Sequence, residues 1–133
     1  MAVAKSMITA SFLAGSDLST HQYKGVIMHS VANEVTIAGE AGKAIGILQN
    51  APADGEEAVV CVLGVCPAKV KQNSLSAGDH LSVVATTFEL EQSDGAGDHV
   101  VAILLADSSS TAGTTAEILP VLVCHWEAYA SDA

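Results

Sequence analysis

Hydrophobic residues in this chain recur with a period of two, and this alternation constrains the fold more than any other feature. Ile8, Ala10 and Phe12 alternate with polar neighbours, and so do Val35 and Ile37. Successive side chains on a strand point to opposite faces, so each of these segments predicts a half-buried strand. No segment keeps the spacing i, i+3, i+4, i+7 for three turns, as an amphipathic helix would. The pattern therefore predicts an all-β fold.

Two runs, residues 58–63 and 100–105, are apolar at nearly every position. Strands that are covered on both faces have this pattern, so we expect the centre of the core here. The second run contains Val100, Val101 and Ile103, whose β-branched side chains favour a strand over a short helix.

Turn-forming residues separate the apolar runs at short intervals, including Gly15, Gly55 and Gly78, each next to Asp, Ser or Glu. This spacing is typical of a small β-barrel or β-sandwich with short strands and Gly/Asp-rich turns. The 133 residues favour a single domain. We divide it into an extended N-terminal arm (1–7), a β core (8–124) and a C-terminal tail (125–133).

Two finer features concern particular positions. The segments 77–80 and 96–99 both read Ala-Gly-Asp-His, and because the identity does not extend outward we interpret them as two uses of one turn, not as a structural repeat. Pro120 lies inside an apolar run, and a proline cannot donate a ladder hydrogen bond. We therefore expect its strand to lie at an edge or to bulge.

The formal charge is −10, with five lysines and no arginine. Nucleic-acid binding requires a basic surface, and anionic membranes attract one, so both partners are disfavoured. The longest mainly apolar stretch, 58–66, is too short for a spanning helix. The start of the sequence lacks a signal-peptide pattern, so we expect synthesis in the cytoplasm.

A catalytic group is not expected. Cys124 and His125 are adjacent, so on a strand they point to opposite faces and cannot easily form a dyad. The three cysteines are interpreted as buried thiols. The glycine-rich segment 39–46 lacks the spacing of a phosphate-binding loop and is interpreted as a turn.

A metal site could form only if the two Gly-Asp-His turns met. Turn aspartates more often cap backbone N–H groups, so we expect neither metal nor cofactor. The residues concerned are Asp79, His80, Asp98 and His99.

An alternative function is a free-standing cytoplasmic β-barrel, either a carrier or a small-ligand-binding module. A carrier would present its modified lysine at a hairpin tip, whereas Lys69 and Lys71 fall in an alternating segment that predicts a strand. A ligand pocket needs aromatic walls, and aromatic residues make up only 4% of the chain.

Four segments in succession resemble the capsid cement, or decoration, proteins of tailed bacteriophages. They are Ala14-Gly-Ser-Asp-Leu-Ser with Gln22-Tyr23, then Ala44-Ile-Gly-Ile-Leu-Gln-Asn-Ala-Pro, then Gly55-Glu-Glu-Ala-Val-Val-Cys-Val-Leu-Gly-Val, then Ser76-Ala-Gly-Asp. The resemblance covers roughly residues 13 to 84, and the later part of the chain departs from it. It implies a structural protein on the exterior of a virion capsid, without catalytic residues or a cofactor.

The partners that this resemblance implies are the major capsid protein and further copies of the chain, with a homotrimer favoured over a dimer. The matching positions are core and turn residues, so they do not identify contacts. Termini can reach a neighbouring molecule, and we therefore place the contacts there. The candidate residues are Val3, Met7, Ile8, Trp126 and Tyr129.

Overall fold

A computed structural model describes residues 7–37, 43–71, 75–84, 86–93, 99–107 and 117–127. These residues contain β-strands and no α-helix, so the predicted all-β fold is confirmed. No helix that could span a membrane occurs in the described part of the chain. The strands are β1 (Met7–Ala14), β2 (Gly25–Met28), β3 (Glu34–Thr36), β4 (Gly46–Leu48), β5 (Glu57–Val70), β6 (His80–Val83), β7 (Leu90–Gln92), β8 (His99–Leu104) and β9 (Glu117–Glu127).

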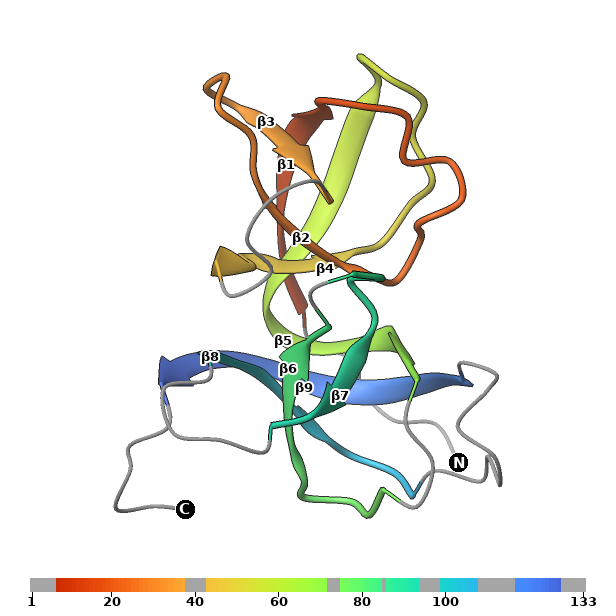
Figure 1. Cartoon of the computed structure of the whole chain (residues 1–133), viewed down its shortest axis with the longest axis vertical. Coiled ribbons are helices and arrows are strands. Elements are labelled where there is room, and N and C mark those ends of the chain that lie inside the picture. The colour runs from red at the N-terminus through yellow and green to blue at the C-terminus, as the bar shows by residue number, and fades with distance from the viewer. Residues whose placement is uncertain are drawn as a thin grey trace.

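The strands form two small closed barrels that share β5. In the first barrel the order is β1-β3-β2-β4-β5, and β5 pairs again with β1. In the second barrel the order is β5-β7-β6-β8-β9, and β9 pairs again with β5. Figure 1 shows the first barrel in the upper half of the molecule and the second in the lower half. A small β-barrel was one of the two architectures that the sequence predicted.

Strand β5 passes from one barrel to the other at Gly64. Before this glycine β5 pairs with β1 and β4, and after it β5 pairs with β9 and β7. The φ angle of Gly64 is +104°, a conformation that a residue with a Cβ rarely adopts. A glycine at this position therefore allows one long strand to complete both barrels.

The second barrel repeats the first strand by strand. Each pair of neighbouring strands in one barrel has a counterpart in the other, with the same direction and the same register. The register of β2 on β3 (Ile27 opposite Thr36, Met28 opposite Val35) recurs in β6 on β7 (Ser82 opposite Glu91, Val83 opposite Leu90). The register of β1 on β5 (Ser11 opposite Val59, Leu13 opposite Glu57) recurs in β5 on β9 (Pro67 opposite Pro120, Lys69 opposite Ile118).

The turns repeat as well. Tyr23 and Gly78 both have positive φ. The Tyr23 N–H donates to the carbonyl of Leu48, the last residue of β4, and the Gly78 N–H donates to the carbonyl of Leu104, the last residue of β8, each at 2.7 Å. The two Gly-Asp-His segments are not equivalent to each other in this repeat, because residues 77–80 correspond to residues 22–25 of the first barrel. His80 and His99 begin β6 and β8, which are neighbours in the same barrel. They are therefore not units of a structural repeat, as predicted, and residues 96–98 lie outside the described residues.

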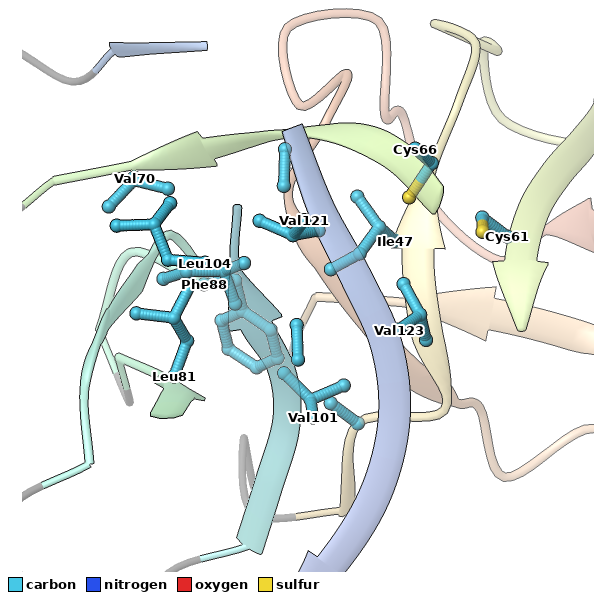
Figure 2. Packing of buried hydrophobic residues seen from close by; sticks show 14 of the residues in the cluster. Ile47, Cys61, Cys66, Val70, Leu81, Phe88, Val101, Leu104, Val121 and Val123 are labelled. Atoms are coloured by element: carbon cyan, nitrogen blue, oxygen red, sulfur yellow. The ribbon is translucent and has the colours of Figure 1, made fainter. Parts of the chain in front are cut away.

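The strands between the two barrels are buried on both faces. Neighbouring residues on β2, β4 and β5 enter two different hydrophobic cores, so these strands form a layer that both barrels cover. Residues of the first core are Val26, Leu48 and Val60, and residues of the second are Ile27, Ile47 and Cys61. Figure 2 shows the second core, with Ile47 beside Val121 and Val123 of β9. The prediction that residues 58–63 lie at the centre of the core is confirmed at Ala58, Val60 and Cys61, whereas Val59 and Val62 are half-buried and Leu63 is exposed.

The boundaries of the predicted arm and tail require correction. Strand β1 already includes Met7, and β9 continues to Glu127, which pairs with His99 of β8. The first three residues of the predicted tail therefore belong to the sheet, because β8 offers them a partner. Gly46, the last residue of the segment interpreted as a turn, instead begins β4.

Pro120 lies in a strand that is paired on both sides, and the register of β9 on β5 runs through it without a bulge, so the prediction of an edge or a bulge is wrong. It faces Pro67 of β5, and neither proline has an N–H to leave unpaired. The carbonyl of Pro120 accepts a hydrogen bond from the Leu105 N–H at 3.0 Å, and that of Pro67 accepts one from Gln49 Nε2 at 3.3 Å. The two prolines meet where no ladder donor is required.

Candidate interaction surfaces

The predicted contact residues fall into three groups. Met7 and Ile8 begin β1, and both are exposed, Ile8 to 58%. Trp126 lies in β9, where its backbone pairs with Val100. Val3 and Tyr129 lie outside the described residues.

Exposed apolar residues occur where β1 begins, at Met7 and Ile8, and at Leu63 of β5. Ile8 lies opposite Leu63 and Met7 lies opposite Gly64, just before the point where β5 bends. Leu63 is 49% exposed. We call Met7, Ile8 and Leu63 the β1–β5 patch. Sequence reasoning missed Leu63 because it ends a run of core residues, although the glycine that follows marks the end of that core segment.

A second apolar surface is a groove of about 390 Å³ on the outer face of the second barrel. Ile118, which is 47% exposed, Leu105 and Pro120 are its exposed members. We call it the β9 groove. Its lining residues are Val65, Cys66, Pro67, Leu105, Ile118, Leu119 and Pro120. Sequence reasoning did not find this groove, because its two sides come from segments that only the sheet register brings together.

Basic side chains gather beside the β9 groove. Lys69 lies opposite Ile118 in the register of β5 and β9. Lys24 Nζ lies 3.1 Å from His21 Nδ1. Burial lowers the pKa of Lys24, Glu89 opposes that shift, and the charge of Lys69 adds to it. Burial also lowers the pKa of His21, and the charges of Lys24 and Lys69 add to that effect. Three basic groups of an acidic chain thus lie close together.

A pair of histidines joins β8 to β9. His99 Nε2 lies 3.2 Å from His125 Nδ1, and the rings stack with centroids 5.3 Å apart. With Lys43, Ala44 and Ile45 they line an open pocket of about 330 Å³. Burial lowers the pKa of His125, and the charge of His99 adds to this. Hydrogen bonds that the ring donates to the backbone of Val62 and Ile45 oppose the shift.

The lowered pKa of His125 predicts that acid destabilises the protein. The unfolded chain takes up a proton near the ordinary value of 6.5, before folded His125 does, so the stabilising contribution is full above 6.5 and is lost as the pH falls toward the folded pKa. Thermal unfolding followed between about pH 7.5 and pH 5.5 should show a fall in Tm that the His125→Gln variant reduces. His21→Gln should act in the same direction, because its pKa is also lowered. An unchanged slope of Tm against pH in both variants would contradict this prediction.

The cysteines of this structure are thiols held in or near the core. The Sγ–H of Cys124 donates to the Leu122 carbonyl at 3.7 Å, and burial raises the pKa of Cys124, which keeps it protonated. His125 is engaged with His99 instead of Cys124. A hydrogen bond with Cys61, together with burial, raises the pKa of Cys66. The geometry therefore provides no activated thiol at Cys66 or Cys124.

The Gly-Asp-His segments behave as turns where the structure describes them. Asp79 Oδ2 accepts a hydrogen bond from the Ser76 N–H at 2.9 Å, so this aspartate caps its own turn, as expected. Asp98 lies outside the described residues. Among the residues that are described, no three His, Cys, Asp or Glu side chains gather closely enough to hold a metal ion.

Comparison with known proteins finds similarity at the level of structure. No family model matches the sequence, and no curated protein matches it either. The chain is similar in structure to the N base of the head fiber protein gp8.5 of bacteriophage phi29, with a TM-score of 0.63 and 11% sequence identity. The match covers 90% of this chain and 95% of that chain. The similarity therefore concerns the fold of most of the chain.

Proposed function

We propose that this chain is a structural protein of a tailed-phage virion, which binds the outer surface of the capsid and stabilises the shell as a cement protein. One observation carries the proposal. Four successive segments of the sequence resemble phage cement proteins, and 90% of the chain matches the fold of a phage head fiber base. One similarity lies in the sequence and the other in the fold, and both point to the phage head.

The surface of the described residues is consistent with this role. A cement protein must bury apolar area against the shell, and the β1–β5 patch offers Met7, Ile8 and Leu63 for that purpose. The charge of −10 without arginine is suited to the outside of a shell whose interior holds DNA. The proposed partners are therefore the major capsid protein and further copies of the chain, and neither nucleic acid nor membrane.

The proposal includes no enzymatic activity. Catalysis needs a nucleophile or general base that other groups orient toward a shared site. In the described part of the chain, the candidate Cys124 is protonated and engaged with its own strand, and His125 pairs with another histidine. The proposed function depends on surface contacts.

Binding of the protein to heads and stabilisation of those heads are the direct tests. A ligand that binds only the assembled shell shifts the equilibrium toward assembly by about 2.7 kcal/mol per site when its free concentration is a hundred times Kd. Purified protein should co-sediment with undecorated heads and raise the temperature at which they release DNA. Because apolar contacts dominate, we expect this attachment to survive moderate salt.

A matched pair of substitutions tests the surface. Ile8→Asp places a charge in the β1–β5 patch and should weaken co-sedimentation by about tenfold or more. Val31→Asp, at an exposed position in the β2–β3 turn, should leave binding unchanged. Failure of the unmodified protein to co-sediment, or binding that does not stabilise heads, would contradict the cement function and favour a free-standing module.

A further inference from the structure

The two barrels carry different side chains at equivalent places on their outer faces. In the first barrel Leu13 of β1 lies opposite Glu57 of β5. The equivalent pair in the second barrel is Lys69 of β5 opposite Ile118 of β9. Both faces thus combine one exposed apolar residue with one charged residue, but the charges have opposite signs.

The β9 groove is apolar at places where the first barrel is polar. Leu105 occupies the position of Gln49, as shown by equivalent backbone hydrogen bonds, Leu105 N–H to Pro120 and Gln49 N–H to Val59. In the first barrel the Gln49 side chain donates to the carbonyls of Ile47 and Pro67 at 3.3 Å. In the second barrel Leu105 is exposed instead.

The same change occurs on the neighbouring strands. Pro67 stands where the first barrel has Ser11, and Ile118 stands where it has Glu57. The backbone pairing is the same in both barrels, so the barrel architecture does not require apolar side chains here. An exposed apolar groove that the fold does not require indicates a docking surface.

We propose that copies of this chain associate head to tail, with the β9 groove of one copy docked on the Leu13–Glu57 face of a second copy. In this contact Ile118 packs against the second copy's Leu13, and Lys69 pairs with the second copy's Glu57. This inference deepens the proposed function, because it assigns a surface to the self-association that the cement role includes.

Charge complementarity selects a second copy as the occupant. The chain has a formal charge of −10, so most surfaces of one copy would repel those of a second copy. The β9 groove differs from that acidic average, because Lys69 lies opposite Ile118 and Lys24 lies close to Lys69, with Glu89 as an acidic neighbour of Lys24. Leu13 is 47% exposed and has glutamates on both sides, Glu57 on β5 and Glu34 on β3. An apolar residue with acidic neighbours therefore matches an apolar groove with basic neighbours.

The contact joins two different faces, so it is heterologous. Such contacts close into rings when the rotation between copies permits and otherwise continue as filaments. A homotrimer, the oligomer favoured from the sequence, is one closed form that is compatible with this arrangement.

A charge exchange tests the proposed contact in solution. Sedimentation equilibrium of the unmodified protein should show an oligomer that dissociates on dilution. Lys69→Glu and Glu57→Lys should each raise the dissociation constant by about tenfold or more, since each puts like charges together. The double variant, with both charges exchanged, should regain most of the lost affinity. Ile118→Asp should yield monomers, whereas Met28→Asp, at an exposed position of the first barrel, should not.

Three outcomes would overturn the proposal: an unmodified protein that is monomeric at its highest attainable concentration, single variants that associate normally, or a double variant that is no better than the singles. Circular dichroism of each variant verifies that it is folded. Co-sedimentation of Ile118→Asp with heads separates this proposal from the cement function, since a variant that is monomeric but still binds heads confirms the two roles separately. If the unmodified protein oligomerises by this contact but does not bind heads, the cement function fails and the head-to-tail contact stands.

Discussion

Replacing Gly46 with valine is expected to destabilise the protein by at least about 3 kcal/mol, because no side chain fits at this point of β4. A Cβ built on Gly46 would lie against the carbonyl oxygen of Cys61, and 2.9 Å from a methyl group of Val60. Both neighbours belong to β5, which cannot move away without opening the layer between the barrels. Urea unfolding followed by circular dichroism should show a much lower midpoint.

The internal repeat supplies a matched control for this substitution. Ala102 holds the equivalent position of β8, and there a methyl group is accommodated and buried. Ala102→Gly should cost only about 1 kcal/mol, from added backbone freedom and one lost methyl group. A Gly46→Val variant with an unchanged midpoint would mean that β4 does not approach β5 as closely as described.

Truncation of Ile47 is expected to have the second largest effect, a loss of about 2–5 kcal/mol for Ile47→Ala. Ile47 is fully buried, pairs with Cys61, and extends into the second core, where Figure 2 shows it beside Val121 and Val123. Removing its side chain leaves a cavity between two barrels that can close only if both shift. The free energy of unfolding from urea titration measures this loss.

The same substitution at the surface should be nearly silent for stability. Ile8→Ala removes the same atoms from an isoleucine that is more than half exposed, and we expect a change within about 0.5 kcal/mol. Comparable losses at both positions would contradict the assignment of Ile8 to an exposed patch. Since Ile8→Ala keeps the fold, it can also be tested for weaker attachment to heads.

Local patterns were sufficient to predict the longer strands and β3, but not the short strands β2, β4, β6 and β7. The alternation around Val35 corresponds to β3, and the β-branched run at Val100 and Val101 corresponds to β8. Both signals are local, because they depend on the side chains of a few neighbouring residues. The run beginning at Ala58 was correctly placed in the core at Ala58, Val60 and Cys61, although Val59 and Val62 are only half-buried.

Local patterns failed where the answer depended on a partner strand. Pro120 was expected at an edge, but Pro67 faces it across the sheet, and that pairing removes the need for a donor. The predicted tail was cut at His125 because polar residues follow, whereas pairing with β8 carries the strand to Glu127. Leu63 was assigned to the core with its neighbours, and the bend at Gly64 exposes it.

By itself, the sequence determined that the chain is an all-β protein of short strands, that the strand beginning at Ala58 contributes to its core, and that Met7 and Ile8 are available at the surface. Only the tertiary structure decided that the strands close into two equivalent barrels and that the β9 groove and the Leu13–Glu57 face occupy equivalent places with opposite charge. The reason is physical. Strand propensity and burial act within a few residues, whereas barrel closure and surface complementarity depend on register between segments far apart in the chain. Equivalent positions such as Tyr23 and Gly78, or Gln49 and Leu105, share backbone geometry without sharing side chains, so no comparison of residues could reveal the repeat.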